Sequence, residues 1–592
     1  MPTLQHTAPP RLESTQSRSV DRLLGGIAVA VPVVLFWIIW SYYAVNVPKW
    51  DDHALRGFLY DLDEETTFFG KIYQFFRQHN EHRIVVDRLV AFIDYNVTGK
   101  LNFRHLMAVG NLSLIGIVLL LMDLFRREGR SAWYVVPVPF LLLNLANWEN
   151  MYWGMAALQN FWIVFWSMLT CYLLAYTQHW RWAIAVATLA TLTSGNGLLI
   201  WPIGIILLAL RSVDSQIGGK HRFLPLVAWV VSAGIVIGLY FAGYKKPAGN
   251  PPDKSSVFEV VKGGVAFLGA SVEALPVRSA LQSSVLFGGA LVLVAILLIG
   301  FGLLRYGQVI GHTILQFTKS SASGKSKAIP PITLFFWGVM AFIFGTTAVV
   351  AWGRTGFGLD LIITSRYKIY SLLLLVMLYV YVVLIAGRAL GKWIMVGGIA
   401  GSVLFYWSSY FSFLDEAIWF RHWQLTNQFN WTYTMSKPIS TLKPEAYTEP
   451  APAFYDVALP VIYGPAEQKT IPLTVIKQPT GYLIETDKST PADLLKPQTV
   501  EQDAGSYLLA RSAKRSYLFP VRPNKRSLIQ ARLWPFNQFT DGFKTEIMPG
   551  TLEPGTYQLF VLRVTSQNQC KIYPTNQLVT SSELPKDVEK NW

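Results

Sequence analysis

The residues best suited to do chemistry lie in the first long polar stretch of the chain, residues 46–106. An acidic pair, Asp51 and Asp52, opens this stretch. One carboxylate of the pair could take a proton from an acceptor hydroxyl, while a cation or hydrogen bonds hold the other. The alternative is that two acids after a hydrophobic span simply end that span in water. Because charged groups are costly near hydrocarbon, the further charges in the same stretch favour an active site.

A denser group of polar side chains follows at His79, Asn80, Glu81, His82 and Arg83. We expect a helix to begin near Asn80, with Glu81 in its first turn, where the helix dipole favours an acid. The alternative is a solvated amphipathic helix on the membrane surface with no chemical role. Two histidines at this spacing are a weak metal signal, so no metal ligands are predicted, and dependence on a divalent cation is left open.

A third candidate is Glu149, which lies in a short turn between Trp148 and Tyr152. An acid beside aromatic rings suits a sugar, because the rings stack on its apolar face and the acid hydrogen-bonds its hydroxyls. The alternative is an aromatic belt at the membrane interface, which is common.

Residues 353–368 carry three cations, Arg354, Arg366 and Lys368, against one acid, Asp360. We expect this loop on the outer side of the membrane, where an excess of cations is disfavoured. Arginine forks bind phosphate oxygens well, so the loop is a candidate phosphate site. The alternative is pairing with lipid headgroups or with Asp51, Asp52 or Glu149.

These loops need a membrane-embedded scaffold to hold them. The chain has 592 residues, of which 52% are hydrophobic and only 15% charged, values typical of a polytopic membrane protein. Its formal charge of +15 does not indicate nucleic-acid binding, because many lysines and arginines lie in short loops between apolar spans. The two cysteines, Cys171 and Cys570, predict no disulfide framework.

The apolar runs predict a mostly α fold, a transmembrane bundle of about eleven spans, since roughly 20 apolar residues cross a bilayer. Residues 182–210 favour a short in-and-out pair with its tip at Ser194–Gly197, because polar and small residues interrupt the run there. The alternative is one long tilted helix. The predicted spans lie near 23–45, 104–125, 131–147, 156–177, 182–210, 223–243, 284–304, 332–352, 369–387 and 393–412.

Changes in composition along the chain predict four parts. Residues 1–22 form a cytoplasmic tail, and residues 23–412 form the membrane domain, which includes the long outer loop 46–106. Residues 413–451 are expected to be interfacial helices and linker. Residues 452–592 should form a β-sandwich-like domain outside the cytoplasm, because alternating runs follow turn signals there. We therefore expect a multi-pass protein of the inner or plasma membrane.

The membrane domain resembles the GT-C glycosyltransferase superfamily over about residues 20–412. The resemblance rests on a first span followed by a long outer loop that opens with Asp51 and Asp52. It rests also on Leu192–Gly197, which is similar to a Thr-Lys-Gly-Pro element of aminoarabinose and O-mannosyl transferases, with Ser194 where those families often have lysine. Ser365-Arg366-Tyr367 is a further element seen in membrane proteins of this general type.

The resemblance implies an inverting transfer from a polyprenyl-phosphate sugar to a glycan, lipid or protein acceptor at the outer face. It implies Asp51 or Asp52 as the base. The donor phosphate would be bound by Arg83, Arg354, Arg366 and Lys368. Sugar or acceptor would be bound by His79, Glu81, His82, Trp148, Glu149 and Tyr152. Two alternatives stay open: an O-antigen-type ligase or polymerase, and a non-catalytic transporter or scaffold for glycan export. No nucleic-acid partner and no certain cofactor are expected.

Overall fold

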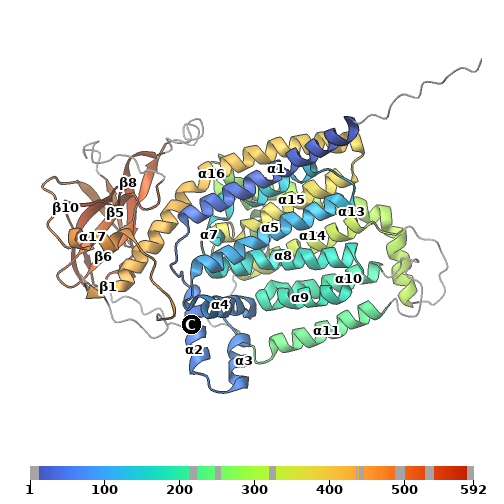
Figure 1. Ribbon diagram of the computed structural model, residues 1–592, viewed down its shortest axis with the longest axis horizontal. Helices are drawn as coiled ribbons and strands as arrows, with labels where there is room; N and C mark the ends of the chain where they lie inside the picture. Colours follow the sequence, from blue (N-terminus) through green and yellow to red (C-terminus); the bar gives the residue numbers. More distant parts are fainter. Residues whose placement is uncertain are drawn as a thin grey trace, which may run out of the picture.

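The chain folds into a helical bundle with a β-sheet region at one end (Figure 1). The computed structural model describes most of the chain, and the predicted cytoplasmic tail lies largely outside the described residues. Those residues are 13–211, 223–246, 255–318, 328–434, 437–438, 446–479, 481–486, 501–526 and 539–582.

Eight helices of the described chain are long and apolar enough to cross a membrane. The predicted mostly α, membrane-embedded fold is therefore confirmed, whereas the predicted number of about eleven spans stays a prediction. The eight helices are α1 (Glu13–Tyr43), α5 (Phe103–Arg127), α8 (Gly154–Tyr176), α11 (Leu224–Phe241), α13 (Ala280–Thr318), α14 (Pro331–Arg354), α15 (Lys368–Ile385) and α16 (Arg388–Thr432).

Two shorter helices form the predicted in-and-out pair. Helix α9 (Trp180–Thr193) and helix α10 (Ile200–Arg211) are joined by the 3-10 turn η3 (Gly195–Leu199). Arg211, at the end of α10, donates to the carbonyl oxygens of Leu174 and Thr177, just before α9 begins. Both outer ends of the pair therefore lie on the same side of the bundle, and η3 is its tip.

The segment predicted as a span at 131–147 crosses the bundle but is not one helix. At one end Arg130 donates to the Ala386 carbonyl over 3.1 Å, and at the other the Glu149 amide donates to Ser365 Oγ over 3.2 Å. Pro137 breaks the helix because proline has no N–H to donate. The pieces are η1 (Ala132–Val135), α6 (Pro137–Leu142), η2 (Leu145–Asn147) and α7 (Trp148–Met151).

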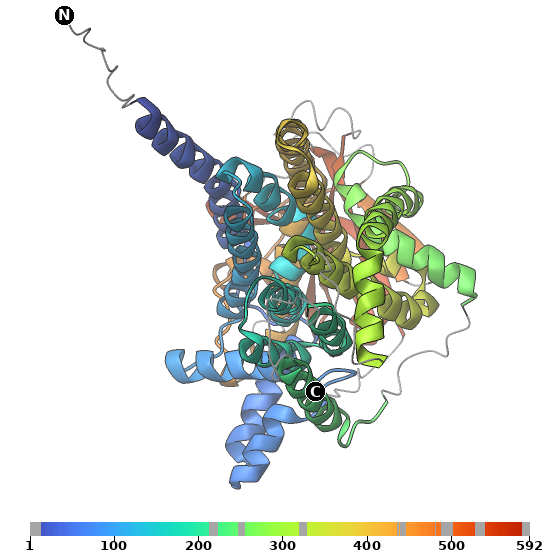
Figure 2. The same ribbon diagram turned by 90° about the vertical axis from the view of Figure 1, so that its right-hand side faces the viewer.

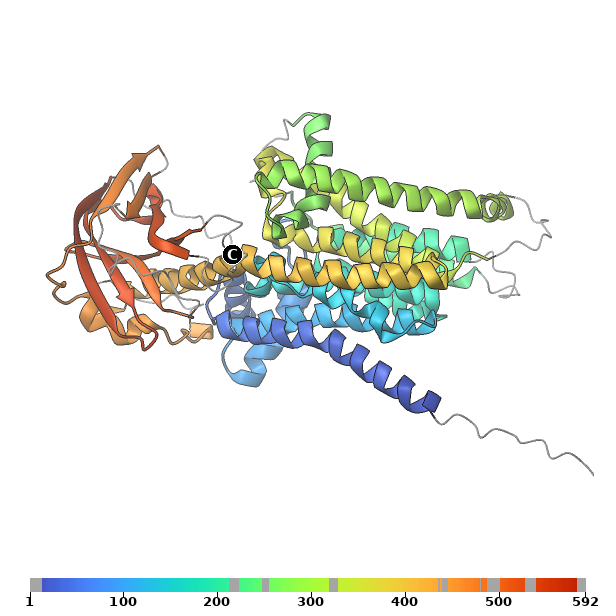
Figure 3. The ribbon, with the colours of Figure 1, turned by 90° about the horizontal axis from the view of Figure 1, so that it is seen from above.

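Helix α16 runs from the bundle into the β region as one element of 45 residues (Figures 1 and 3). The first part of residues 413–451, predicted as interfacial helices and linker, is therefore helical as a continuation of α16, and its place at the interface stays a prediction. No glycine or proline occurs between 413 and 432, so nothing in the sequence ends the helix where it leaves the apolar stretch. The helix thereby carries the C-terminal region on a rigid connection.

The C-terminal region contains two four-stranded antiparallel sheets, in the orders β10-β9-β5-β6 and β3-β4-β8-β7. Residues of both sheets share one apolar core, and the other face of the first sheet packs on α16 and α17 (Phe454–Ile462). A two-residue ladder, β1 (Tyr433–Thr434) with β2 (Lys437–Pro438), follows α16. The sheet strands are β3 (Leu473–Gln478), β4 (Gly481–Thr486), β5 (Gly505–Arg511), β6 (Ser516–Pro520), β7 (Arg522–Lys525), β8 (Phe539–Ile547), β9 (Gly555–Val564) and β10 (Cys570–Ser581).

The polar stretch between α1 and α5 forms three helices at the end of the bundle nearest the β region. These are α2 (Asp52–Glu64), α3 (Phe68–Phe76) and α4 (Val85–Thr98). Figures 1 and 2 both show α2 and α3 projecting sideways from the bundle. On the same end, α12 (Val257–Gly269) begins with a capping box of Ser256 and Glu259. Its first turn is exposed, whereas its last turns are buried among other helices.

Candidate functional site

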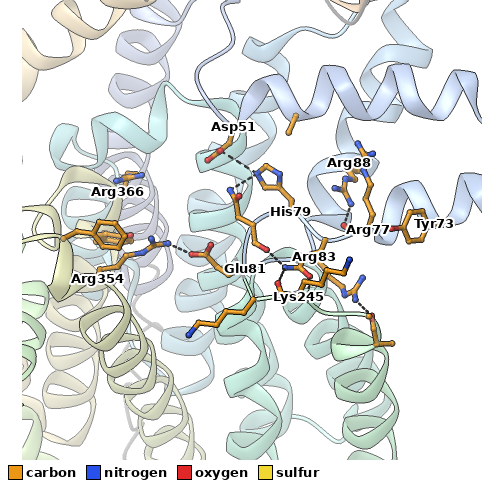
Figure 4. A pocket seen from close by; sticks show the side chains of 18 of the residues that line it. Asp51, Tyr73, Arg77, His79, Glu81, Arg83, Arg88, Lys245, Arg354 and Arg366 are labelled. Carbon is orange, nitrogen blue, oxygen red and sulfur yellow. Dashed lines mark hydrogen bonds and ion pairs between the residues drawn. The ribbon is translucent and has the colours of Figure 1, made fainter. Parts of the chain in front are cut away.

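Two connected cavities lie at this end of the bundle. The larger, about 1190 Å³, is here called the basic cavity, and the smaller, about 440 Å³, contains the tip of the α9–α10 pair and is called the hairpin cavity. The residues that line both define their junction (Figure 4). They are Asp51, His79, Asn80, Glu81, Arg354, Arg366 and Tyr367.

The structure distinguishes the two acids of the predicted catalytic pair. Asp51 lines both cavities, its side chain is 43% exposed, and its Oδ1 lies 3.7 Å from His79 Nε2. Asp52 is fully buried and lines neither cavity. Its carboxylate accepts the backbone N–H groups of Lys49 at 3.0 Å and Met155 at 2.7 Å. Burial raises the pKa of Asp52 to about 7, against the effect of these two hydrogen bonds. Of the predicted catalytic pair, Asp51 alone faces the cavities.

The segment before Asp51 is fixed by a buried cation. Lys49 Nζ lies 3.1 Å from Glu149 Oε1 and within 4.5 Å of the ring centroids of Trp50, Trp153 and Phe420. Burial lowers the pKa of Lys49, and the adjacent carboxylate opposes that shift. Trp50 has a φ of 43°, a left-handed conformation that is rare for a bulky residue. This turn directs Lys49 inward and leaves the next residue, Asp51, at the cavity wall.

Residues 79–82 form a tight turn. The backbone N–H of His79 and the carbonyl of His82, and the reverse pair, are each joined by a 2.8 Å hydrogen bond. Asn80 has a φ of 47°, which asparagine tolerates better than most residues. The predicted helix start at Asn80 is wrong, because the next helix begins only at Val85. The turn directs Glu81 into the junction, where its carboxylate pairs with Arg354 (Figure 4).

His82 connects this turn to the tip of the helix pair. Its Nδ1 accepts the backbone N–H of Gly195 at 3.1 Å. Burial lowers the pKa of His82, which keeps the ring neutral and able to accept that bond. Among the described residues no group of three or more His, Cys, Asp or Glu side chains is arranged to hold a metal ion.

Of the four predicted phosphate ligands, only Arg354 and Arg366 lie at the junction. Arg354 and Arg366 line both cavities and are 34% and 30% exposed. Arg83 lines the basic cavity, but it donates to three backbone carbonyls, including that of Tyr240 at 2.6 Å. Lys368 lines neither cavity and pairs with Glu273 at 2.8 Å. Arg83 and Lys368 therefore stabilise the fold around the site.

The predicted sugar-binding turn is also structural. Glu149 is buried between Lys49 and Arg366, whose Nε lies 3.7 Å from Glu149 Oε2. The Tyr152 hydroxyl donates to the Ile39 carbonyl over 3.3 Å. Trp148 packs on an aromatic ring of α16, Phe420, at a centroid distance of 5.3 Å. None of the three lines either cavity, so the structure does not bring Trp148, Glu149 and Tyr152 to the junction.

Residues that the sequence analysis did not assign to binding line the hairpin cavity. Trp153 follows the predicted sugar-binding turn directly and precedes the first residue of α8, and no periodic pattern there indicates which side chain faces inward. Asn196, at the hairpin tip, donates to the Tyr370 hydroxyl over 2.9 Å and to Thr346 Oγ1 over 3.3 Å. Within the described residues its Oδ1 is buried without a hydrogen-bond partner, so an acceptor is left in the cavity wall.

Comparisons with protein-family models, with curated proteins and with solved structures find no match to this chain. The chemistry of the site is therefore that of its own side chains. At the junction a half-exposed carboxylate, Asp51, shares one space with two guanidinium groups, Arg354 and Arg366. Such an arrangement can accept a proton from a hydroxyl and bind a phosphate nearby.

Proposed function

We propose that this chain is a membrane glycosyltransferase of the GT-C type. In this proposal it transfers a sugar, with inversion, from a polyprenyl-phosphate donor to an acceptor hydroxyl of an envelope glycan, lipid or protein. The observation that carries the proposal is the junction, where Asp51 shares a cavity wall with Arg354 and Arg366. A carboxylate base and cations for a departing phosphate are the groups that such a transfer requires.

The proposed reaction uses the junction residues in distinct roles. The Asp51 carboxylate takes the proton of the acceptor hydroxyl, whose oxygen attacks the anomeric carbon of the donor sugar. The bond from that carbon to the phosphate oxygen breaks, and the phosphate leaves with the electron pair. Arg354 and Arg366 stabilise the charge that develops on it. His79, 3.7 Å from Asp51, orients the carboxylate.

The hairpin cavity is the proposed donor site. Its lining includes Val349 of α14 and Phe241 of α11, which are 55% and 50% exposed on the outside of the bundle. An isoprenoid chain could therefore lie in the bilayer while its phosphate reaches Arg354 and Arg366. Asn196 Oδ1 is a hydrogen-bond acceptor for a sugar hydroxyl there.

The proposed orientation places the junction outside the cytoplasm. Basic side chains gather at the end of the bundle opposite the β region, among them Arg126, Arg127 and Arg211 near helix ends and Arg388 at the start of α16. Such residues remain cytoplasmic in membranes that follow the positive-inside rule. The N-terminus would then be cytoplasmic, and the β region extracytoplasmic.

The substitution Asp51→Asn tests the proposal. Loss of a general base lowers turnover by about 100-fold or more. We expect this loss when purified protein transfers label from a panel of polyprenyl-phosphate hexoses and pentoses to an envelope extract. Binding of the donor should persist, because Asp51 is not a phosphate ligand in the proposal. Unchanged transfer by Asp51→Asn would refute the assigned base, and no transfer by the wild type from any donor would refute the function.

The neighbouring acid is a matched control for this experiment. Asp52→Asn replaces one of two backbone-bonded oxygens with an amide that cannot accept the bond. We expect a lower melting temperature, because an unsatisfied buried N–H costs about 1–3 kcal/mol. Asp51→Asn should melt like the wild type, since Asp51 is half-exposed.

An O-antigen-type ligase or polymerase, which joins lipid-diphosphate glycans, is the second candidate. The excess of cations in the basic cavity favours it, because a diphosphate carries more charge than a monophosphate. Turnover with matched lipid-phosphate and lipid-diphosphate donors separates the two functions. A ligase would use only the diphosphate.

A further inference from the structure

The charged wall of the basic cavity is strongly unbalanced. Its two acids, Asp51 and Glu81, lie at the junction, where one faces His79 and the other pairs with Arg354. Away from the junction, all charged side chains that line the cavity in the described chain are cations. The seven lining cations are Arg77, Arg83, Arg88, Lys245, Lys246, Arg354 and Arg366.

Several of these charges have no acidic partner. Arg83 and Arg88 are 8% and 2% exposed and donate to backbone carbonyls, and no carboxylate of the described residues lies within ion-pair distance of either. Lys245 and Lys246 are exposed and likewise form no ion pair within the described parts of the chain. Arg77 does pair with Asp61, at 2.6 Å. Uncompensated charges near a low-dielectric wall attract an anion strongly.

The electrostatic state of Arg88 agrees with this imbalance. Burial, and next the repulsion from Arg77, lower the pKa of Arg88 to about 9, although the neighbouring Asp87 opposes that shift. A bound anion would offset both the repulsion and the cost of burial. The cavity is therefore built at an energetic cost that an anionic ligand relieves.

The two lysines are held at the cavity by the loop that carries the junction. Gln78 Nε2 donates to the Lys245 carbonyl over 2.6 Å, and the Lys245 N–H donates back to Gln78 Oε1 over 2.9 Å. This reciprocal pair joins the end of α11 to the turn before His79. The lysines thus sit beside the junction by backbone geometry, independently of their own side chains.

One edge of the basic cavity is apolar. Tyr73 lines the cavity and belongs to α3, a helix without a single buried residue. On the same helix Phe68 and Phe69 are 72% and 81% exposed. Figures 1 and 2 show α3 projecting sideways at the end of the bundle that carries the junction. An exposed aromatic helix in this place is suited to the boundary between headgroups and hydrocarbon.

We propose that the basic cavity binds the phosphate- or carboxylate-bearing headgroup of a membrane lipid, whose hydrocarbon chains lie along α3. Basic clusters beside an apolar membrane surface bind anionic headgroups, each cation contributing appreciably. If the chain is the glycosyltransferase proposed above, on which this role rests, the lipid is its acceptor and its hydroxyl reaches Asp51 at the junction. A soluble anionic glycan could bind the cations of the cavity, but it would make no use of the exposed aromatic side chains of α3.

Lipid binding by the full-length protein in a neutral detergent tests this proposal. The probes are phosphatidic acid and phosphatidylcholine of equal chain length, with bound copies counted by native mass spectrometry. We expect phosphatidic acid to bind more tightly, and Lys245→Ala with Lys246→Ala to weaken it by about 10-fold or more. The matched control is Lys262→Ala with Lys477→Ala, two lysines on α12 and β3 that do not line the cavity and should leave binding unchanged.

Two further measurements make the outcome decisive. The double substitution Phe68→Ser and Phe69→Ser should weaken the binding of phosphatidic acid but leave the binding of inorganic pyrophosphate unchanged. Equal binding of both lipids, or equal loss in the Lys262 and Lys477 control, overturns the proposal. Pyrophosphate binding without any preference for phosphatidic acid also overturns it and indicates a soluble anion. Asp51→Asn should retain the lipid preference, so failure of the transferase activity and failure of lipid binding can be told apart.

Discussion

Three carboxyl groups of the first polar stretch differ in how the protein compensates their charge. Asp51 is half-exposed and faces an imidazole, whereas Asp52 is buried but accepts two backbone N–H groups. Asp87, near the start of α4, is buried, and within the described residues neither of its oxygens has a hydrogen-bond partner. Asp51 is therefore suited to proton transfer, and Asp52 fixes the start of α8. The buried carboxyl group of Asp87 lowers the free energy of unfolding.

Asp87 gives a prediction about pH. Burial raises the pKa of Asp87 well above its ordinary value, so the folded protein keeps a proton that the unfolded chain releases. A raised pKa contributes stability at low pH that is lost as pH rises toward the folded pKa. Asp87→Asn removes this titration. We expect its melting temperature relative to the wild type to increase as pH rises above the ordinary pKa of an aspartate. A difference that does not change with pH would contradict this assignment.

At the scale of elements, the α9–α10 pair depends on close approach at its tip. A Cβ added to Gly197 would lie 2.2 Å from the Ala190 carbonyl oxygen and 2.7 Å from the Thr191 nitrogen. Both are backbone atoms of α9, so the tip would have to move. Because Gly195 in the same turn donates to His82, such movement would also disturb the junction.

Gly197→Ala should therefore destabilise the protein by about 1–3 kcal/mol, the usual cost of overpacking. Chemical denaturation in detergent measures this change. Gly238→Ala in α11 is the matched control, because nothing lies within 4 Å of a Cβ there. A Gly197→Ala protein as stable as the Gly238→Ala protein would mean that the tip is loosely packed.

At the scale of the whole molecule, the β region reaches the candidate site through α16. Arg421 on α16 donates to both carboxylate oxygens of Asp503, at 2.7 and 3.2 Å. The same guanidinium donates to the carbonyls of Tyr43 and Ala44, each at 3.4 Å. Those carbonyls begin the segment that leads to Asp51. The β region thereby stabilises the segment that positions the proposed base.

Asp503→Ala should loosen that segment. The change leaves a buried guanidinium without its carboxylate, which is strongly destabilising locally. We expect the amides of residues 43–50 to exchange hydrogen for deuterium about 10-fold faster, an opening that is easier by about 1.4 kcal/mol. Glu467→Ala, which removes an exposed pair with Lys571 within the β region, is the control and should leave that peptide unchanged. Equal exchange in both variants would mean that the membrane domain alone fixes the segment.

The sequence by itself predicted the mostly helical membrane domain, the β-sheet region and the in-and-out pair with its tip at Ser194–Gly197. It also located two polar stretches that meet at the junction, residues 46–106 through Asp51 and Glu81 and residues 353–368 through Arg354. These features follow from the length of apolar runs, the position of glycines and the placement of charges. All of them are local properties that a single chain displays without its neighbours.

The tertiary structure alone decided which side chains of those loops face the cavities. Asp52 accepts an N–H 103 residues away, Lys49 meets Glu149 across 100 residues, and Arg354 reaches Glu81 across 273. Each contact uses a polar group that the sequence left as a candidate ligand. Burial forces such groups to find partners inside the fold, and those partners are set by packing between distant segments. The side chains of Asp51 and Arg366 remain partly exposed at the junction, because their contacts with His79 and Glu149 do not bury them completely.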